Sequence, residues 1–177
     1  WSTRCKRYER RRPMAGIERS VSMDVVSQPT HRTGLIVGRF DPPHLGHSYM
    51  IDWVARRCDT LVVFVNTSPD RDTAPGVLRA QWLSELHPDV TVIEVAHRLG
   101  TDFDDEDLWA KWMALFTARW PHEDGPHAVF SSDPYVVELA KRFGADHVMV
   151  DPDRSTVPIS ATQIREDPAR HLEQLAP

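Results

Sequence analysis

The chain has 177 residues, of which 41% are hydrophobic, and a formal net charge of −5. This length suits one α/β domain with a sizeable core, and the negative charge argues against a nucleic-acid-binding surface over the whole protein. No apolar run approaches the roughly 20 residues of a membrane span, and the N-terminus lacks the apolar centre of a secretory signal. The two cysteines, Cys5 and Cys58, form neither a disulfide framework nor a zinc spacing, so we expect a cytoplasmic protein with no membrane partner.

The beginning of the chain differs in composition from the rest. Its first 19 residues contain seven Lys/Arg and no sustained hydrophobic period. We therefore expect residues 1–32 to form a basic, disordered extension and residues 33–177 to form the domain. An upstream extension, a cloning remnant or a mis-assigned start, with Met14 or Met23 nearer the true beginning, explains this stretch better than an arm that contacts nucleic acid. No helix-turn-helix fits here, and we expect no nucleic-acid partner.

The stretch from Gly34 to His47 predicts a strand, a tight loop and the start of a helix. The apolar run Leu35–Val37 ends at Gly38, and two prolines delay the helix that follows. His44 and His47 would both project from the first turn of that helix, beside unpaired backbone N–H groups and the positive end of the helix dipole. A turn of this kind suits a phosphate group.

Helices and strands alternate along the remainder of the chain. Apolar runs and turn residues predict strands at 61–65, 90–95, 127–130 and 147–150, and helices at 45–57, 77–86, 135–143 and after Ser160. This alternation predicts a single α/β domain with a Rossmann-like, doubly wound parallel sheet of about five strands.

Five carboxylates between Asp102 and Asp107 precede a tryptophan-rich helix. Their plain interpretation is electrostatic support of the helix start, and a magnesium site made only of carboxylates is the alternative. Helical spacing predicts that Trp112 and Trp120 pack in the core. Trp109 lies in the first turn, near the edge of the sheet where ligands bind, and could instead stack on a ligand.

Two motifs resemble the nucleotidyltransferase superfamily, whose signatures are G-x-F-x-P-x-H-x-G-H and I-S-x-T-x-I-R. Residues 38–47 and 159–165 match every fixed place of these signatures. Within the superfamily, residues 130–134, residues 150–154 and the Trp109-x-x-Trp112 pair are similar to NadR-type nicotinamide mononucleotide (NMN) adenylyltransferases. The resemblance starts at about Gly34 and runs to the C-terminus.

Two further features bear on that resemblance. Residues 172–177 resemble the junction to a kinase domain in bifunctional members, but no G-x-x-x-x-G-K-[ST] phosphate loop occurs in the sequence, so a kinase activity has no support. The Phe40-Asp41 pair is closer to the G-x-F-D of cytidylyltransferases than to the NadR type.

The resemblance implies transfer of AMP from ATP to NMN, giving NAD and pyrophosphate by in-line attack without a covalent intermediate. It implies catalytic roles for His44, His47 and Arg165. It also implies Mg²⁺ held mainly by ATP phosphates rather than by protein metal ligands. The NMN contacts would be Trp109, Arg79 and Asp41. The ATP contacts would be Gly38, Arg39, Phe40, His44, Gly46, His47, Ser131, Ser132, Asp133, Ser160, Thr162 and Arg165.

Two alternatives remain open at this stage. One is another enzyme with the same histidine motif, either a cytidylyltransferase or a pantetheine-phosphate adenylyltransferase. The other is a nucleotide-sensing module without catalysis, because residues that bind a nucleotide can be retained without turnover. The sequence is compatible with a homo-oligomer, and it does not distinguish NMN from its deamido form as the acceptor.

Overall fold

The computed structural model describes residues 29–176, so most of the predicted N-terminal extension lies outside the described residues. The elements are β1 (His31–Gly38), α1 (Leu45–Ala55), β2 (Cys58–Thr67), α2 (Gly76–Leu86), β3 (Thr91–Ala96), α3 (Glu106–Arg119), β4 (Ala128–Ser131), α4 (Tyr135–Phe143), β5 (Asp146–Met149), α5 (Ala161–Glu166) and the 3₁₀ helix η1 (Ala169–Gln174).

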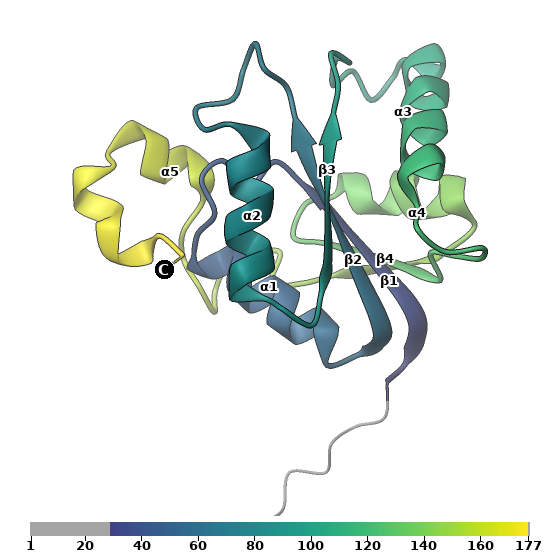
Figure 1. Ribbon diagram of the computed structural model, residues 1–177, viewed down its shortest axis with the longest axis horizontal. Helices are drawn as coiled ribbons and strands as arrows, with labels where there is room; N and C mark the ends of the chain where they lie inside the picture. The colour runs from purple at the N-terminus through teal and green to yellow at the C-terminus, as the bar shows by residue number, and fades with distance from the viewer. Residues whose placement is uncertain (1–28, 177) are drawn as a thin grey trace, which may run out of the picture.

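The five strands form one parallel sheet in the order β3-β2-β1-β4-β5. Helices α1 and α2 cover one face, whereas α3 and α4 cover the other (Figure 1). The strand order reverses between β1 and β4, because the chain returns to the centre of the sheet after β3. This arrangement confirms the predicted doubly wound α/β domain, and it places a crevice at the carboxyl ends of β1 and β4.

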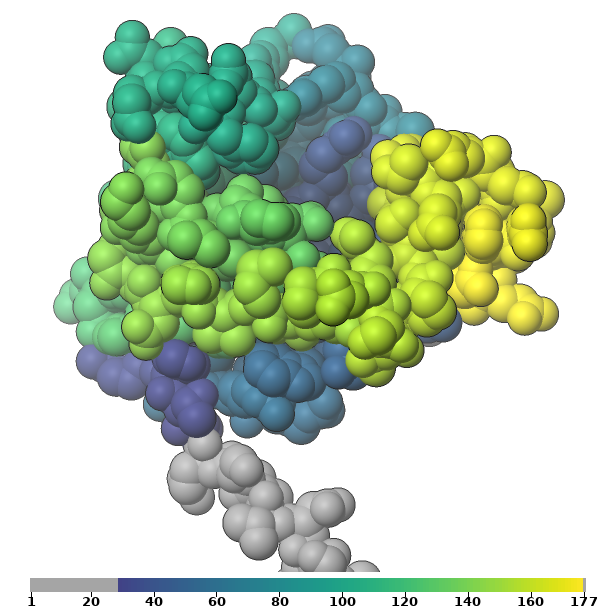
Figure 2. Space-filling model, turned by 180° about the vertical axis from the view of Figure 1, so that it is seen from behind, coloured from purple at the N-terminus to yellow at the C-terminus, as the bar shows by residue number. Residues whose placement is uncertain are grey.

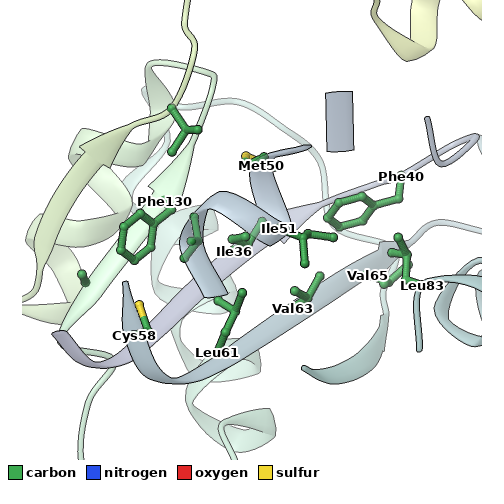
Figure 3. Packing of buried hydrophobic residues seen from close by; sticks show 13 residues of the cluster. Ile36, Phe40, Met50, Ile51, Cys58, Leu61, Val63, Val65, Leu83 and Phe130 are labelled. Atoms are coloured by element: carbon green, nitrogen blue, oxygen red, sulfur yellow. The ribbon is translucent and has the colours of Figure 1, made fainter. Parts of the chain in front are cut away.

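Alternate residues of the central strands supply two separate cores. Ile36 and Val63 point to the side of α1, where they pack with Ile51 and Met50 (Figure 3). On the other face, Leu35 and its neighbours pack against the tryptophan-rich face of α3 and against α4. Burial on both faces explains why the strands read as continuous apolar runs rather than alternating ones.

The observed boundaries differ from the predicted ones by a few residues. The helix predicted at 45–57 ends at Ala55, because the N–H of Arg57 bonds to the carbonyl of Val54 and turns the chain toward β2. Strand β1 starts at His31, before the expected domain start at 33, because His31 pairs with Cys58 of β2. Pairing of this kind depends on the neighbouring strand, which no local pattern reveals.

The acidic stretch before α3 has the predicted helix-start role. The Asp105 carboxylate caps α3 by accepting the N–H of Leu108 at 3.0 Å. Asp102 accepts the N–H of Asp104, and Glu106 pairs with Arg142 of α4 at 2.8 Å. Within residues 29–176, no group of three or more His, Cys, Asp and Glu side chains is arranged to hold a metal ion. The carboxylate-only magnesium interpretation therefore has no geometric support in this part of the chain.

None of the helices between residues 29 and 176 combines the length and the apolar character needed to cross a bilayer.

Candidate functional site

A cavity of about 380 Å³ opens at the carboxyl edge of the sheet, where the strand order reverses. Its walls come from the loop after β1, the loop after β4, the start of α3 and the start of α5. In Figure 2, the dark blue residues of the early chain are visible at the back of a hollow between the green α3 region and the yellow C-terminal segment. Segments from both ends of the described chain therefore meet at one site.

The two histidines of the first motif lie at the start of α1 with their rings stacked, 3.6 Å between centroids. His44 is the N-cap residue, and its Nδ1 accepts the N–H of Gly46 at 3.1 Å. The proton of the neutral ring is therefore on Nε2, which can donate to a ligand. A Cβ at position 46 would lie 3.0 Å from the His44 ring, a tight contact that glycine avoids.

His47 lines the large cavity, whereas His44 lines a small adjoining cavity that shares His47, Ser132 and Arg154 with the large one. Nδ1 of His47 is buried and has no hydrogen-bond partner among the described residues. A buried polar atom without a partner is uncommon in a folded protein and is typical of a site that receives its partner from a ligand or water.

Both histidines are held in the neutral form. Burial, followed by the positive charge of Arg154, lowers the pKa of His44 to about 4. Burial, His44 and Arg154 together hold the pKa of His47 well below its usual range. A negatively charged ligand beside these rings would raise the pKa of both histidines, because it neutralises Arg154 and favours the imidazolium form.

The second motif reaches the same cavity from the opposite end of the chain. Ser160 caps α5 in a capping box with Gln163, at the helix start that the sequence predicts. Arg165 donates to the hydroxyl of Thr162 at 3.1 Å and to the backbone carbonyl of Asp41. This second bond joins α5 to the loop that carries the histidines.

Arg154 is a site residue that the sequence-based list omits. Its side chain is 43% exposed, lines both cavities and pairs with Asp133 at 3.2 Å. Its backbone has φ of 48°, in the left-handed region. The carboxylate of Asp151, which accepts N–H groups of Ser155, Thr156 and Val157, fixes the loop around it. The signal that could have identified Arg154 was the similarity of residues 150–154 to NadR-type NMN adenylyltransferases.

Aromatic side chains line the end of the cavity near α3. Trp109 lines the cavity, but it is only 4% exposed and donates its indole N–H to the carbonyl of Phe103 at 3.0 Å. The guanidinium of Arg142 lies over the Trp109 ring, 4.6 Å from its centroid. Phe103, which is 58% exposed, also lines the cavity and stacks on Tyr135. No periodic pattern in the sequence points to Phe103, because this residue lies in a loop.

The predicted core roles of the other two tryptophans agree with the structure. Trp112 is buried against Phe116 and Trp120 is half-buried against the same cluster. Trp112 also lines the cavity.

Two of the expected NMN contacts have their polar groups occupied within the protein. Asp41 lines the cavity, but its carboxylate accepts the N–H and hydroxyl of Thr73 and the N–H of Ala74. Burial alone would raise the pKa of Asp41, but these hydrogen bonds and the charge of Arg79 hold it below its usual value. Arg79 is fully buried and lines neither cavity, so the structure does not bring it to a ligand position. The family resemblance implied that Arg79 contacts NMN, but the sequence could not show that its side chain turns inward.

The structure brings most of the other expected residues together. Those that line the large cavity are Gly38, Arg39, Phe40, Asp41, His47, Trp109, Ser131, Ser132, Asp133, Ser160, Thr162 and Arg165. Those that line only the small adjoining cavity are His44 and Gly46.

These features define a doubly wound α/β protein with a cavity at its switch point, lined by the His47 imidazole and arginines at one end and by aromatic rings at the other. Residues 35–167 match the family described as cytidylyltransferase-like, and the chain belongs to that family.

Curated relatives share modest identity with the chain. The trifunctional NAD biosynthesis/regulator protein NadR of Escherichia coli (strain K12) is 27% identical over 159 residues, covering 80% of this chain and 38% of NadR. The nicotinamide-nucleotide adenylyltransferase of Saccharolobus solfataricus is 28% identical over 119 residues, covering 63% of this chain and 64% of that protein.

Solved structures show the same fold. A crystal structure of NadR protein in complex with NR has a TM-score of 0.62 and 25% identity, and the match covers 84% of this chain and 44% of that one. A bifunctional NMN adenylyltransferase/ADP ribose pyrophosphatase from Francisella tularensis has a TM-score of 0.59 and 14% identity, which is a likeness of fold alone. The chain spans less than half the length of the NadR proteins that it matches.

Proposed function

We propose that this chain is a nicotinamide-nucleotide adenylyltransferase, which transfers AMP from ATP to NMN and releases pyrophosphate. The observation that carries the proposal is the meeting of His47 and Arg165, from motifs at opposite ends of the domain, on one cavity with an aromatic end. The similarity to NadR and to curated nicotinamide-nucleotide adenylyltransferases supports the choice of acceptor.

In the proposed reaction, a phosphate oxygen of NMN attacks the α-phosphorus of ATP, and the bond from that phosphorus to the pyrophosphate oxygen breaks. The protein must align two polyanions and stabilise negative charge as it grows on the phosphate oxygens. His44 and His47 donate to those oxygens from the start of α1. Arg165 binds the outgoing pyrophosphate with its forked donors, and Arg39 and Arg154 add positive charge around it.

MgATP is the substrate form in this proposal. The Asp41 carboxylate, which lies closest in sequence to the histidines, has both oxygens engaged by Thr73 and Ala74. The donor set of the cavity therefore fits a metal ion held by phosphate oxygens and water, as Mg²⁺ commonly is. The ion would neutralise charge on the pyrophosphate that leaves.

The adenosine of ATP would lie against Ser131, Ser132 and Asp133 after β4, and the nicotinamide ring against the aromatic end formed by Trp109 and Phe103. One face of the Trp109 indole already meets Arg142. The exposed Phe103 ring and the part of Trp109 that lines the cavity can contact a flat, cationic ring.

The test is a pyrophosphate-release assay with ATP or CTP and a panel of acceptors: NMN, its deamido form and phosphopantetheine. We expect release only with ATP and a pyridine mononucleotide, together with NAD or its deamido analogue as the product. Preference for CTP or for phosphopantetheine would assign the chain to another activity of the family. ATP binding without pyrophosphate release from any acceptor would favour a nucleotide-sensing module.

A further inference from the structure

A buried arginine on α2 links the loop after β1, which lines the cavity, to the loop after β2. Arg79 is fully buried, and its Nε donates to the carbonyl of Ala74 at 2.9 Å. Its two terminal nitrogens donate to the carbonyl of Arg39 and to the carboxylate of Asp72. The guanidinium thus joins the loop after β1, the loop after β2 and the first turn of α2.

Asp72 connects this buried arginine to one at the cavity. Its carboxylate is 4% exposed and accepts the N–H of Ser68 at 2.7 Å in addition to Arg79. Its other oxygen accepts Nη2 of Arg39 at 3.0 Å and Nε at 3.3 Å. Arg39 is 42% exposed and lines the cavity. Asp72 therefore holds Arg39 by two donors of its guanidinium.

Arg39 has further partners that fix its direction. Its Nη2 lies 3.0 Å from the carbonyl of Arg71 and 3.4 Å from the carboxylate of Asp41. The positive charges of Arg39 and Arg79 are balanced by Asp41 and Asp72, so the cluster as a whole is neutral. The side chains of Asp41, Asp72 and Arg79 are all buried and therefore require partners, because an unpaired buried charge is costly.

We propose that Asp72 and Arg79 are positioning residues that hold the guanidinium of Arg39 in place for a phosphate of the nucleotide. Neither residue needs to touch the ligand, since neither lines a cavity. Arg79 acts through the carbonyl of Arg39 and through the carboxylate of Asp72, which holds the Arg39 side chain. An arginine held by two bonds loses less conformational freedom when it binds a phosphate, so preorganisation increases affinity. This inference rests on the proposed function only in taking Arg39 as a phosphate contact.

The experiment is a double-mutant cycle on MgATP binding, measured by calorimetry on the whole chain without an acceptor. Asp72→Asn keeps the shape of the side chain and removes its charge. We expect it to weaken binding about tenfold, the lower end for one charge-assisted hydrogen bond. In an Arg39→Ala background, the same substitution should change the dissociation constant less than twofold, because the residue that it positions is gone.

Arg98→Lys is the matched control. Arg98 follows β3 and pairs at 3.2 Å with Asp70, which lies on the same loop as Asp72, but both side chains are exposed and neither lines a cavity. We expect no change in MgATP binding. Arg79→Lys, which keeps the charge but cannot bridge both loops, should reproduce the Asp72→Asn loss and provides a second route if the first variant does not fold.

The inference would be overturned if Asp72→Asn weakened MgATP binding equally with and without Arg39, or if it weakened binding in neither background. A merely structural role would lower the melting temperature without the selective coupling to Arg39. Because the assay measures binding alone, the coupling can be present even if no AMP transfer is detected. In that case the proposed function fails and the positioning role stands.

Discussion

At the scale of single residues, neutral histidines are the central chemical feature of the site. The Nδ1 of His44 accepts a backbone N–H, and that of His47 has no partner among the described residues, while Arg154 disfavours additional positive charge. Neutral imidazoles can donate one hydrogen bond each to phosphate oxygens. Their contribution should therefore appear where charge grows on those oxygens, in the transition state.

His47→Ala should lower kcat about a hundredfold or more, the scale for the loss of one oxyanion donor, with a smaller effect on KM for ATP. Steady-state kinetics with saturating NMN measures both constants. His147→Ala, which alters an exposed histidine on β5, is the control and should be unchanged. A raised KM for ATP with normal kcat would contradict the proposed role.

MgATP binding should take up protons near pH 6. The pKa of His44 is about 4 in the free protein, so the ring is neutral at this pH, and a bound polyphosphate raises that pKa toward or above its usual 6.5. Calorimetry in two buffers of different ionisation enthalpy measures the uptake. His44→Gln should reduce the uptake, whereas unchanged uptake in that variant would assign the proton to another group.

Trp109→Ala should affect both stability and the acceptor. Its burial predicts a loss of about 3–5 kcal/mol in the free energy of unfolding, the range for removing a buried tryptophan. Contact with the nicotinamide ring predicts a KM for NMN that rises about two- to thirtyfold, with KM for ATP unchanged. Trp120→Ala, from the same apolar cluster but outside the cavity, should lower stability alone. If Trp109→Ala and Trp120→Ala had the same KM for NMN, Trp109 would be a core residue without contact to the acceptor.

At the scale of elements, the site is assembled from loops that rigid elements hold in place. Helix α1 begins at the histidine turn, α5 is fixed by its capping box, and α2 supplies the buried Arg79. The C-terminal segment after η1 also reaches the histidine loop, because Leu175 pairs with His44 as an isolated antiparallel bridge.

Ala176→Pro should weaken this clamp on the histidine loop. The N–H of Ala176 donates to the carbonyl of Pro43 at 3.3 Å, and proline has no N–H to donate. Leu175 already has φ of −61° and ψ of 146°, which a following proline accepts. We expect a loss of about 0.5–1.5 kcal/mol in stability and a measurable fall in kcat. Ala176→Gly keeps the N–H and is the control. Equal kcat for the two variants would show that the bond does not support the histidine loop.

At the scale of the whole molecule, the cavity joins the loop after β1, the loop after β4 and α5, which are distant in sequence. A nucleotide bound there would connect these segments and stabilise the folded state. At a concentration one hundred times its dissociation constant, MgATP should add about 2.7 kcal/mol to the free energy of unfolding. For a domain of this size that corresponds to a rise of about 5–10 °C in Tm.

Arg165→Lys provides the comparison for this ligand effect. A lysine keeps the positive charge but cannot bind the pyrophosphate by two parallel bonds, so the rise in Tm at the same MgATP concentration should be smaller. Thermal unfolding followed by tryptophan fluorescence measures both proteins. An equal rise in the two would show that the forked geometry of Arg165 is not needed.

The sequence alone was sufficient for the architecture and for the two motifs. Apolar runs bounded by turn residues located every strand of the sheet and most helices, because burial on both faces requires continuous apolar character. The caps of α5 at Ser160 and of α4 at Gly144 are local features, because each is made by residues close together in the sequence. Strand ends such as that of β1 at His31 depended on pairing with a neighbouring strand.

Only the tertiary structure decided which polar side chains face the cavity. Arg79 lies at the start of α2, after the loop that follows β2, and Arg154 lies in the loop that follows β5, yet Arg79 turns inward to Asp72 while Arg154 lines both cavities. That difference depends on partners up to forty residues away, such as the Arg39 carbonyl, which no local pattern contains. Likewise, the Trp109 spacing predicted a helix face, but the contact with Arg142 of α4 required the fold. Side-chain direction at a site is set by long-range packing and charge pairing, so it is determined when the chain folds.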